Sequence, residues 1–230
     1  RVWHEVNELR KAKPCPMHSR HFWTCMAPAL FLFGDLKVAI RNYEALYEEV
    51  RGFVRDGRGA IANEKYRLGF GQLPPWHSLD FFDVLAERGW NFVFESPGYH
   101  PPIPIDLSNI GDPLERIARN TLHWYTGYYK YANEAHSEAG YPYTYIQWAK
   151  EYEIDGMFLH PLVSCRAASN YLPYVRETLA NELDIPSLWI QGDIVDVTVF
   201  DPADALRKAE AFEEIMDHYR EKRRATRVDG

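Results

Sequence analysis

The chain has 230 residues, 46% of them hydrophobic, which is enough to bury one α/β core with helical additions. Its net charge of -7 argues against general affinity for nucleic acids, although residues 207–227 are locally basic and are interpreted as a solvated helix face. No stretch approaches the roughly 18 apolar residues of a membrane span, no signal peptide precedes Arg1, and three cysteines favour free thiols or metal ligands, so we expect a cytoplasmic protein.

The first 62 residues have the pattern of helices. An amphipathic stretch over 2–13 stops at Pro14, and two further helices are predicted over 19–32 and 35–56. Glycines at 57 and 59 close the last of them. We expect residues 1–62 to form a helical linker region that precedes an α/β domain over residues 63–230.

Two predicted strands follow, over 65–71 (KYRLGFG) and 91–95 (NFVFE), with a helix from near Ser78 to Gly89 between them. The first strand runs into a loop with Trp76 and His77, and the second into a loop with Tyr99 and His100. Further along, Asp112 marks the start of a helix that is expected to end near residue 127, and another helix is predicted over 143–152.

The stretch 154–196 is the most informative part of the chain. Short apolar runs over 157–160 and 187–191 flank helical spacing over 169–184, which predicts a strand–helix–strand unit. A final helix opens at Asp201 and runs to about Arg224. In parallel sheets the ligand site lies beyond the carboxyl ends of the strands, so we expect one crevice there. Its expected polar residues are His160, Ser164, Cys165, Gln191, Asp193 and Asp196.

These elements predict an α/β fold with a doubly wound, mostly parallel, flavodoxin-like sheet. Some familiar ligand motifs are absent from the sequence. It has no Gly-Lys-Ser/Thr phosphate loop and no Gly-x-Ser-x-Gly elbow. The glycines of GFGQLPPWH do not make a dinucleotide fingerprint, because two prolines replace the helix amides that would bind a pyrophosphate.

Four segments together resemble a known family. They are KYRLGFGQLPPWHSLDFFDVLAERG, DPLERIARN, DGMFLHPLVSCRAASNYLPYVRETL and IPSLWIQGDIVDVTVFDPADALRKAEAFEEIMD. Their order, with a Pro-Trp loop, a Ser-Cys-Arg loop and a Gly-Asp-x-x-Asp loop after successive strands, is similar to the benzoyl-CoA reductase and 2-hydroxyacyl-CoA dehydratase family. The resemblance implies an oxygen-sensitive enzyme of two related subunits with iron–sulfur clusters. It also implies an ATP-hydrolysing partner that supplies low-potential electrons.

The resemblance further implies a 4Fe-4S cluster shared between two domains of each subunit. Cys165 corresponds to the ligand of the second domain, so the remaining ligands are expected in a first domain that this chain lacks. Arg166 would then stabilise the thiolate or the cluster's negative charge, or instead pair with a surface acid. Cys15 and Cys25 have no metal-ligand spacing and are interpreted as packing or exposed thiols.

The other candidate site residues have two readings each. His160, with a reference pKa of about 6.5, is the first choice for a proton donor, with His77 and His100 as alternatives; its structural reading is a satisfied core histidine. Trp76 and Tyr99 either line an apolar slot for the acyl group or anchor their loops. Gln191 and Asp193 are assigned to substrate binding. Asp193 and Asp196 either orient the substrate or cap the next element, and capping is the favoured reading.

The expected function is that of an active-site subunit of an ATP-dependent benzoyl-CoA reductase, which reduces an aromatic acyl-CoA. A 2-hydroxyacyl-CoA dehydratase subunit is the alternative, and a non-catalytic structural subunit is the third hypothesis. The expected partners are a homologous second subunit, the ATP-hydrolysing electron donor and the acyl-CoA substrate, with no nucleic acid and no membrane.

Overall fold

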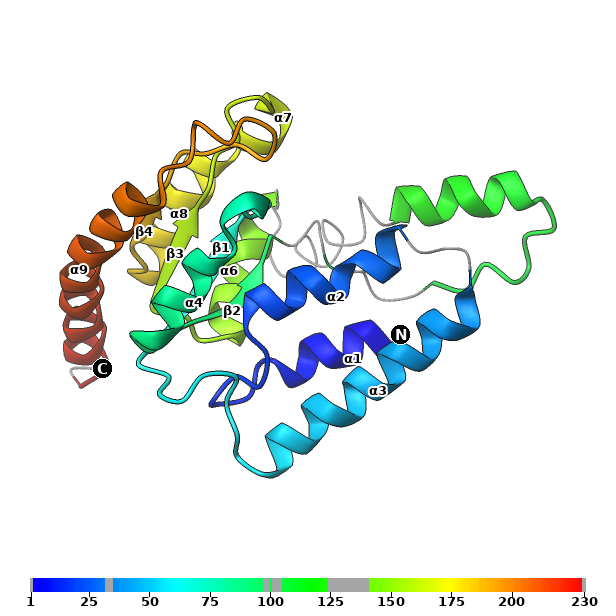
Figure 1. Cartoon of the computed structure of the whole chain (residues 1–230), viewed down its shortest axis with the longest axis horizontal. Helices are drawn as coiled ribbons and strands as arrows, with labels where there is room; N and C mark the ends of the chain where they lie inside the picture. The colour runs from blue at the N-terminus through cyan, green and yellow to red at the C-terminus, as the bar shows by residue number, and fades with distance from the viewer. Residues whose placement is uncertain (1, 32–34, 97–99, 101–104, 124–140, 229–230) are drawn as a thin grey trace.

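The computed structural model describes residues 2–31, 35–96, 100, 105–123 and 141–228 (Figure 1). In chain order the elements are α1 (Val2–Leu9), α2 (Ser19–Phe31), α3 (Leu36–Arg55), β1 (Tyr66–Gly71), η1 (Trp76–Ser78), α4 (Asp80–Glu87), β2 (Trp90–Glu95), α6 (Tyr141–Glu151), β3 (Gly156–Leu159), α7 (Arg166–Ser169), α8 (Leu172–Leu183), β4 (Ser187–Trp189) and α9 (Pro202–Val228).

The predicted helices are confirmed with shifted ends. Residues 113–123 are helical, whereas the expected end of that helix near residue 127 lies outside the described residues. The first helix ends at Leu9, earlier than the predicted Lys13, because the chain turns there and sends the Arg10 side chain into the interior. Within the described ranges, no helix is both long and apolar enough to cross a bilayer.

The strands form one four-stranded sheet in the order β2-β1-β3-β4, and every neighbouring pair is parallel. β3 pairs directly with β4, and α7 and α8 lie between them in the chain, which confirms the predicted strand–helix–strand unit. The crossover through α4 joins β1 to β2. The α/β, doubly wound expectation is therefore confirmed.

Helices cover both faces of the sheet, because side chains alternate between the faces along each strand. In β3, Phe158 contacts Phe81 of α4 and Phe212 of α9, with ring centroids 6.3 Å and 5.9 Å away. Met157 and Leu159 instead join a second cluster with residues of α6 and α8. The result is a three-layer molecule with one hydrophobic cluster on each side of the sheet.

Strand β2 contains a bulge of one residue. Leu68 of β1 pairs with Phe92, and the next pair is Gly69 with Phe94, so Val93 is the extra residue. Val93 and Phe94 consequently lie in the same cluster, against α6. A Cβ atom at Gly69 would stand 2.8 Å from the Phe94 ring, so the tight packing over this position requires glycine.

Helix α2 covers the edge strand β2, and α1 and α3 lie beside α2 in Figure 1. Ser19 of α2 donates a hydrogen bond from Oγ to the backbone carbonyl of Phe92 at 2.9 Å, which satisfies an acceptor that no neighbouring strand pairs with. Trp3, Val6 and Phe22 join the cluster that contains Leu68. The helices thus share a core with the sheet, and the domain division at residue 62 stays a prediction.

A fully buried ion pair joins the end of α1 to the end of β2. Arg10 donates from Nη1 and Nη2 to the two carboxylate oxygens of Glu95, at 2.9 Å and 2.6 Å. His100 Nε2 lies 3.1 Å from the same carboxylate. Burial alone would raise the pKa of Glu95, but the charge and hydrogen bonds of Arg10 outweigh it and lower that pKa to about 2.

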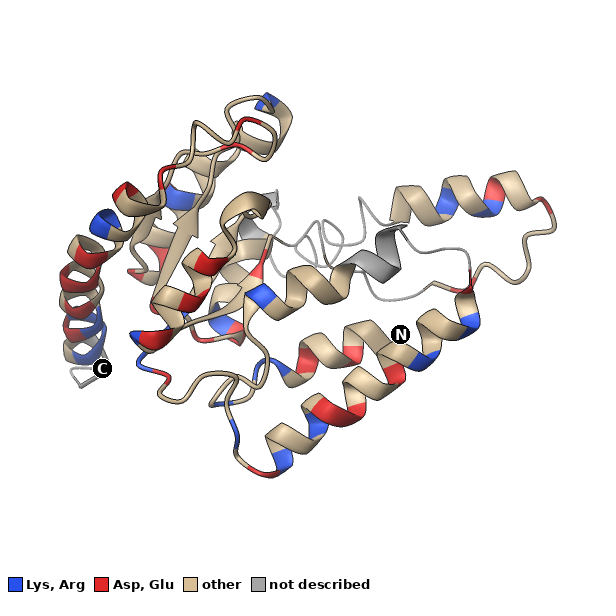
Figure 2. Ribbon diagram, viewed as in Figure 1, with Lys and Arg blue, Asp and Glu red and all other residues tan. Residues whose placement is uncertain are grey.

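Helix α9 lies against the amino ends of β3 and β4. Arg220 donates from Nε and Nη2 to the carboxylate of Asp155, at 2.7 Å each, and Lys222 pairs with Asp184 at 2.5 Å. Figure 2 shows basic and acidic residues interspersed along this helix. The basic stretch is therefore partly anchored on acids of the sheet layer, where the sequence predicted a solvated face.

Replacing Arg10 with methionine should lower the free energy of unfolding by about 3–5 kcal/mol, because it leaves the Glu95 carboxylate buried without its charge partner. Urea unfolding at pH 7 measures the change. Arg55→Met, which removes the exposed pair with Asp56, is the matched control and should leave the midpoint unchanged. Equal effects of both substitutions would contradict a special role for the buried pair.

The same pair predicts a pH dependence. The folded pKa of Glu95, about 2, lies below the unfolded value of about 4.3, so its contribution to stability is present above that unfolded value. It is lost as the pH falls through 2. Urea unfolding between pH 2 and 5 should show this loss in the wild type and a weaker one in the Arg10→Met variant.

Candidate functional site

The carboxyl ends of the four strands share one edge of the sheet, as predicted. The chain leaves β1 at Gln72, β2 at Ser96, β3 at His160 and β4 at Ile190. Because β1 and β3 are the central strands, the segments after them lie in the middle of this edge. Side chains that follow β1 and β3 are therefore the ones best placed to meet a ligand there.

His160 lies at the centre of the edge and is fully buried. Its backbone N–H donates to the carbonyl of Gly71 at 3.0 Å, and its ring Nδ1 lies 2.7 Å from the carbonyl of Leu73. Since a carbonyl can only accept, Nδ1 carries the proton and Nε2 is the unprotonated nitrogen. Nε2 is buried without a hydrogen-bond partner among the described residues, and it lies so close to Gly192 that a Cβ atom there would collide with it.

Burial makes His160 a neutral ring near pH 7. It lowers the pKa of His160 to about 4, in spite of the hydrogen bond to Leu73. In this arrangement Nε2 can accept a hydrogen bond, while the proton on Nδ1 is held by the Leu73 carbonyl. The burial of His160 and the hydrogen bond of its Nδ1 match the structural reading as a core histidine, except that the buried Nε2 has no partner among the described residues. The proton-donor role of His160 stays a prediction.

Asp193 fastens the loop after β3 to the loop after β4. Its Oδ2 accepts from the backbone N–H of Ser164 at 2.7 Å, and its Oδ1 accepts from those of Val195 and Asp196 at 2.8 Å and 3.2 Å. Hydrogen bonds from Ser164 and from these amides hold the pKa of Asp193 well below its usual range. Asp193 therefore acts as a loop cap, the second of its two readings, and its role in substrate binding stays a prediction.

Cys165 lies at the beginning of α7, in the loop that Asp193 holds. It is half-buried and occupies the N-cap position of this short helix, with no side-chain capping hydrogen bond. A thiolate is a soft donor that suits iron, so Cys165 fits one ligand position of an iron–sulfur cluster. Within the described part of the chain, no three His, Cys, Asp or Glu side chains are grouped to hold a metal ion.

The other two cysteines lie in the helical region away from this edge. Cys15 is fully buried, and its Sγ lies 3.3 Å from the carbonyl of Met17. Burial raises the pKa of the Cys15 thiol to about 11, and it also raises the pKa of the half-buried Cys25. Both thiols are protonated at neutral pH, which agrees with their interpretation as packing residues.

Trp76 and His77 follow β1 on the exposed side of the edge. Trp76 is 40% exposed, and its ring meets Trp23 edge to face with centroids 5.9 Å apart. His77 is exposed and lies 2.9 Å from the Ser78 hydroxyl. Phe200 stands between the two histidines, with its ring centroid 5.9 Å from that of His77 and 5.9 Å from that of His160. Phe200 was not predicted as a site residue from the sequence, because its side chain carries no ligand-binding or catalytic group that would single it out.

The remaining candidates divide into three cases. Tyr99 lies outside the described residues, and Gln191 is exposed. His100 was expected in an open loop as an alternative proton donor, but its side chain is 1% exposed. It packs between Phe22 and Trp148, with ring centroids 4.4 Å and 4.6 Å away. This position brings its Nε2 to 3.1 Å from the buried Glu95 carboxylate. Burial lowers the pKa of His100.

A network of four polar side chains at this edge was not predicted from the sequence. Gln72 donates from Nε2 to the hydroxyl of Tyr171, and the hydroxyl of Tyr145 donates to Ser96 at 2.8 Å. The Tyr171 hydroxyl lies 3.5 Å from both Ser96 and Tyr145. Gln72 has φ of +83°, a left-handed backbone that costs a non-glycine residue roughly 1–2 kcal/mol. We call these four residues the hydroxyl network.

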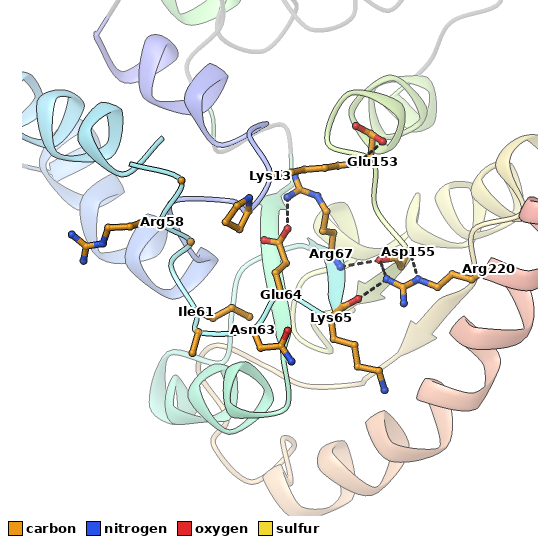
Figure 3. Close-up of a pocket in the computed structure, with 14 residues that line it drawn as sticks. Lys13, Arg58, Ile61, Asn63, Glu64, Lys65, Arg67, Glu153, Asp155 and Arg220 are labelled. Atoms are coloured by element: carbon orange, nitrogen blue, oxygen red, sulfur yellow. Dashed lines mark hydrogen bonds and ion pairs between the residues drawn. The ribbon is translucent and has the colours of Figure 1, made fainter. Parts of the chain in front are cut away.

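A hollow of about 780 Å³ lies at the opposite, amino edge of the sheet (Figure 3). Arg67 and Glu64 form an ion pair in its wall at 2.7 Å, and Asp155 pairs there with Arg220. No residue that the sequence assigned to the site lies in this wall. Its charged residues are Lys13, Arg58, Glu64, Lys65, Arg67, Glu153, Asp155 and Arg220.

Comparisons with known proteins agree with the family resemblance. The chain is 23% identical over 229 residues to the alpha subunit of (R)-2-hydroxyglutaryl-CoA dehydratase from Acidaminococcus fermentans, a match that covers 97% of this chain and 44% of that protein. It is 24% identical over 237 residues to one subunit of the benzoyl-CoA reductase from Thauera aromatica, a match that covers 95% of this chain and 51% of that protein. The chain thus spans about half the length of these relatives.

A family model described as "2-hydroxyglutaryl-CoA dehydratase, D-component" matches residues 1–224, nearly the whole chain. The match confirms the resemblance that the loop motifs indicated, and it includes the strand ends with His160, Cys165 and Asp193. The chain belongs to the family of 2-hydroxyglutaryl-CoA dehydratase D-component and related benzoyl-CoA reductase subunits.

Proposed function

We propose that this chain is part of an active-site subunit that transforms an acyl-CoA by low-potential electron transfer, within a hetero-oligomeric enzyme. The observation that supports this most directly is the position of Cys165, a half-buried thiol at the carboxyl edge of the sheet, in a chain that matches the family from residue 1 to 224. The proposed partners are a homologous second subunit and an ATP-hydrolysing electron donor.

Two reactions are supported equally by the comparisons. One relative is named as a benzoyl-CoA reductase subunit, which agrees with the reaction that the sequence favoured. The other is named as a 2-hydroxyglutaryl-CoA dehydratase subunit, which supports the alternative. Both reactions would use the same fold, and they differ in what becomes of the acyl group.

The product distinguishes the two reactions. The anaerobically purified complex is supplied with a low-potential reductant, ATP and either benzoyl-CoA or 2-hydroxyglutaryl-CoA, and the products are weighed by mass spectrometry. Gain of two hydrogens identifies a reductase, and loss of one water identifies a dehydratase. No turnover of any aromatic or 2-hydroxyacyl thioester by a complex that retains iron would contradict the proposed function.

Cys165 is proposed as one ligand of a 4Fe-4S cluster. The other ligands of this cluster are proposed to come from a first domain of the same subunit. When bound, the cluster would supply single electrons to the acyl group. The chain's own contribution is to hold the thiol in place. The Ser164 amide bonded to Asp193 fixes the loop one residue before Cys165, and the Cys165 amide donates to the carbonyl of Leu162 at 3.2 Å.

Replacing Cys165 with serine should lower the iron content of the anaerobically purified complex and abolish acyl-CoA turnover, because a hydroxyl is a hard and poor substitute for thiolate. Iron analysis and turnover assays measure both effects. Cys25→Ser, a change of another half-buried thiol, is the matched control and should leave both nearly unchanged. Equal iron loss in the two variants would show that the ligand is wrongly assigned, and wild-type iron in both would favour a non-catalytic structural subunit.

Replacing His160 with glutamine should remove an acid-sensitive contribution to stability. The folded pKa of His160, about 4, lies below the unfolded value of about 6.5, so its stabilising effect is complete above that value and declines as the pH falls towards 4. The gap in unfolding free energy between wild type and variant should therefore shrink between pH 7 and 4. Urea unfolding at several pH values measures this gap.

The same variant tests the proposed proton-donor role. If His160 is the general acid, turnover of the glutamine variant falls by roughly a hundredfold while the iron content stays at the wild-type level. Turnover near the wild-type rate would assign His160 to the support of the loop around Gly192 and leave His77 as the remaining exposed histidine of the predicted set.

A further inference from the structure

We propose that the first two turns of α3 form one side of a helix–helix interface. The other side is an amphipathic helix, with a basic flank, from the part of the same subunit that lies beyond these 230 residues. The proposal goes beyond the proposed function, because it concerns how the subunit is assembled and holds for either reaction. It assigns a role to an apolar surface that lies away from the carboxyl edge of the sheet.

One face of α3 carries apolar and aromatic side chains at alternating intervals of four and three residues. They are Leu36, Ile40, Tyr43, Tyr47 and Val50, and we call them the α3 seam. Residues at these intervals lie on one stripe of a helix, and such a stripe is the usual contact surface between two packed helices. Helix α3 therefore presents a packing surface along most of its length.

The later half of the α3 seam is covered, and the earlier half is open. Val50 is 3% exposed, and Tyr43 and Tyr47 are half-buried against the core that includes α1. Ile40 and Leu36, by contrast, are 45% and 67% exposed. Helix length explains the difference, because α1 has 8 residues and spans about 12 Å, whereas α3 has 20 and spans about 30 Å. The interface between α1 and α3 is thus incomplete at the Leu36 end.

The open turns are built as a regular helix. Asp35 caps α3, and its Oδ1 accepts from the backbone N–H groups of Lys37 and Val38 at 3.0 Å and 3.1 Å. The cap stabilises these turns, so Leu36 and Ile40 are held on the line of the seam. Large aliphatic side chains displayed in this way mark a binding surface.

A groove lies where α1 stops covering the seam. Its volume is about 320 Å³, and it is lined by Val2, Trp3, Ile40, Tyr43 and Glu44. Because four of these five side chains are apolar or aromatic, the groove suits an apolar side chain from a helix that continues along the seam. Packing of an amphipathic helix into an apolar groove is a common mode of recognition between protein segments.

The rim of the groove is acidic, which indicates the charge of its occupant. A second hollow of about 460 Å³ adjoins the groove at Val2 and Glu44, and its wall includes Glu5 and Glu48. Glu48 also lies 3.5 Å from Arg51 in an exposed pair. Figure 2 shows acidic residues along both α1 and α3. A helix with Lys or Arg on its flank complements this rim, whereas two identical seams paired together would bring like charges face to face.

Two observations assign the occupant to the same subunit. The chain covers 44% and 51% of the relatives that it matches, so a subunit of their length holds about as much sequence again. The open part of the seam also continues an interface that α1 and α3 already make within one chain. A further helix of the same polypeptide would extend this interface in line with α1.

The helix over residues 113–123 does not fill this place. Its Leu114 and Ile117 are 74% and 64% exposed, so its own apolar side is uncovered as well. In Figure 1 this helix and the beginning of α3 lie at the same end of the molecule, opposite α9. Uncovered apolar side chains therefore gather at the end where the proposed helix would pack.

A photo-crosslinker tests the identity of the occupant. Benzoylphenylalanine is placed at Ile40 in the full-length subunit of the anaerobically purified complex, and crosslinked peptides are identified by mass spectrometry after irradiation. The expected peptide comes from the same polypeptide outside these 230 residues, and it has apolar 3–4 spacing with Lys or Arg beside it. The same group at Ala45, an exposed position on the far side of α3, is the matched control and should not capture that peptide.

A substitution in the seam provides a second measurement. Leu36→Ser in the full-length subunit should lower the apparent melting temperature by about 4 °C or more, because it removes an apolar contact that is buried once the helix is in place. Val38→Ser changes another exposed apolar residue of α3, on the side away from the seam, and should leave the melting temperature unchanged.

Each contrary outcome overturns the proposal in a distinct way. A crosslink from Ile40 to the second subunit, to another copy of this chain or to residues 105–123 would identify a different occupant. Absence of any crosslinked peptide from Ile40, or a wild-type melting temperature in Leu36→Ser, would show that the start of the seam faces water. None of these measurements depends on turnover, so the proposed function stands or falls separately.

Discussion

The buried pair of Arg10 and Glu95 is the interaction on which the relation between the helices and the sheet depends. Taking two charges out of water costs several kcal/mol for each, and this cost is offset only when the partners stay in bidentate contact. Because Glu95 ends β2 and Arg10 follows α1, the N-terminal helices cannot separate from the edge strand without leaving a charge unpaired in the interior. His100 is drawn into the same interior by this carboxylate.

The carboxyl edge is held by a different kind of bond. There, side chains bind backbone groups: Asp193 accepts three backbone amides, and the His160 ring bonds the Leu73 carbonyl. Such bonds set the path of each loop directly, whereas contacts between long charged side chains tolerate shifts. The loop that carries Cys165 is therefore shaped by side-chain bonds to the main chain on either side of it.

The features of the fold that depend only on local sequence pattern could be predicted from the sequence. The apolar runs over 157–160 and 187–191 predicted β3 and β4, and the parallel order then placed His160, Cys165 and Asp193 at one edge. Contacts between distant residues could not be predicted in this way. Gln72 and Tyr171 are 99 positions apart, and neither residue type signals a left-handed turn or a hydroxyl contact. The burial of His100 depends likewise on the pair of Arg10 and Glu95, which are 85 positions apart. The sequence of the loop around His100 does not indicate that Arg10 lies nearby.

The extra residue Val93 determines which way the acid at the end of β2 points. Successive side chains of a strand face opposite sides, so one inserted residue exchanges the sides of all that follow. Through it, Glu95 pairs with Phe70 and shares its side of the sheet, and Phe94 turns towards α6. If the same sequence continued in regular alternation after Phe92, Phe94 would share the side of Phe92, and Glu95 would face the aromatic layer of α6. The bulge at Val93 thus keeps the carboxylate on the side of Phe70 and allows a strand of the same sequence to present a charge to one layer and an aromatic ring to the other.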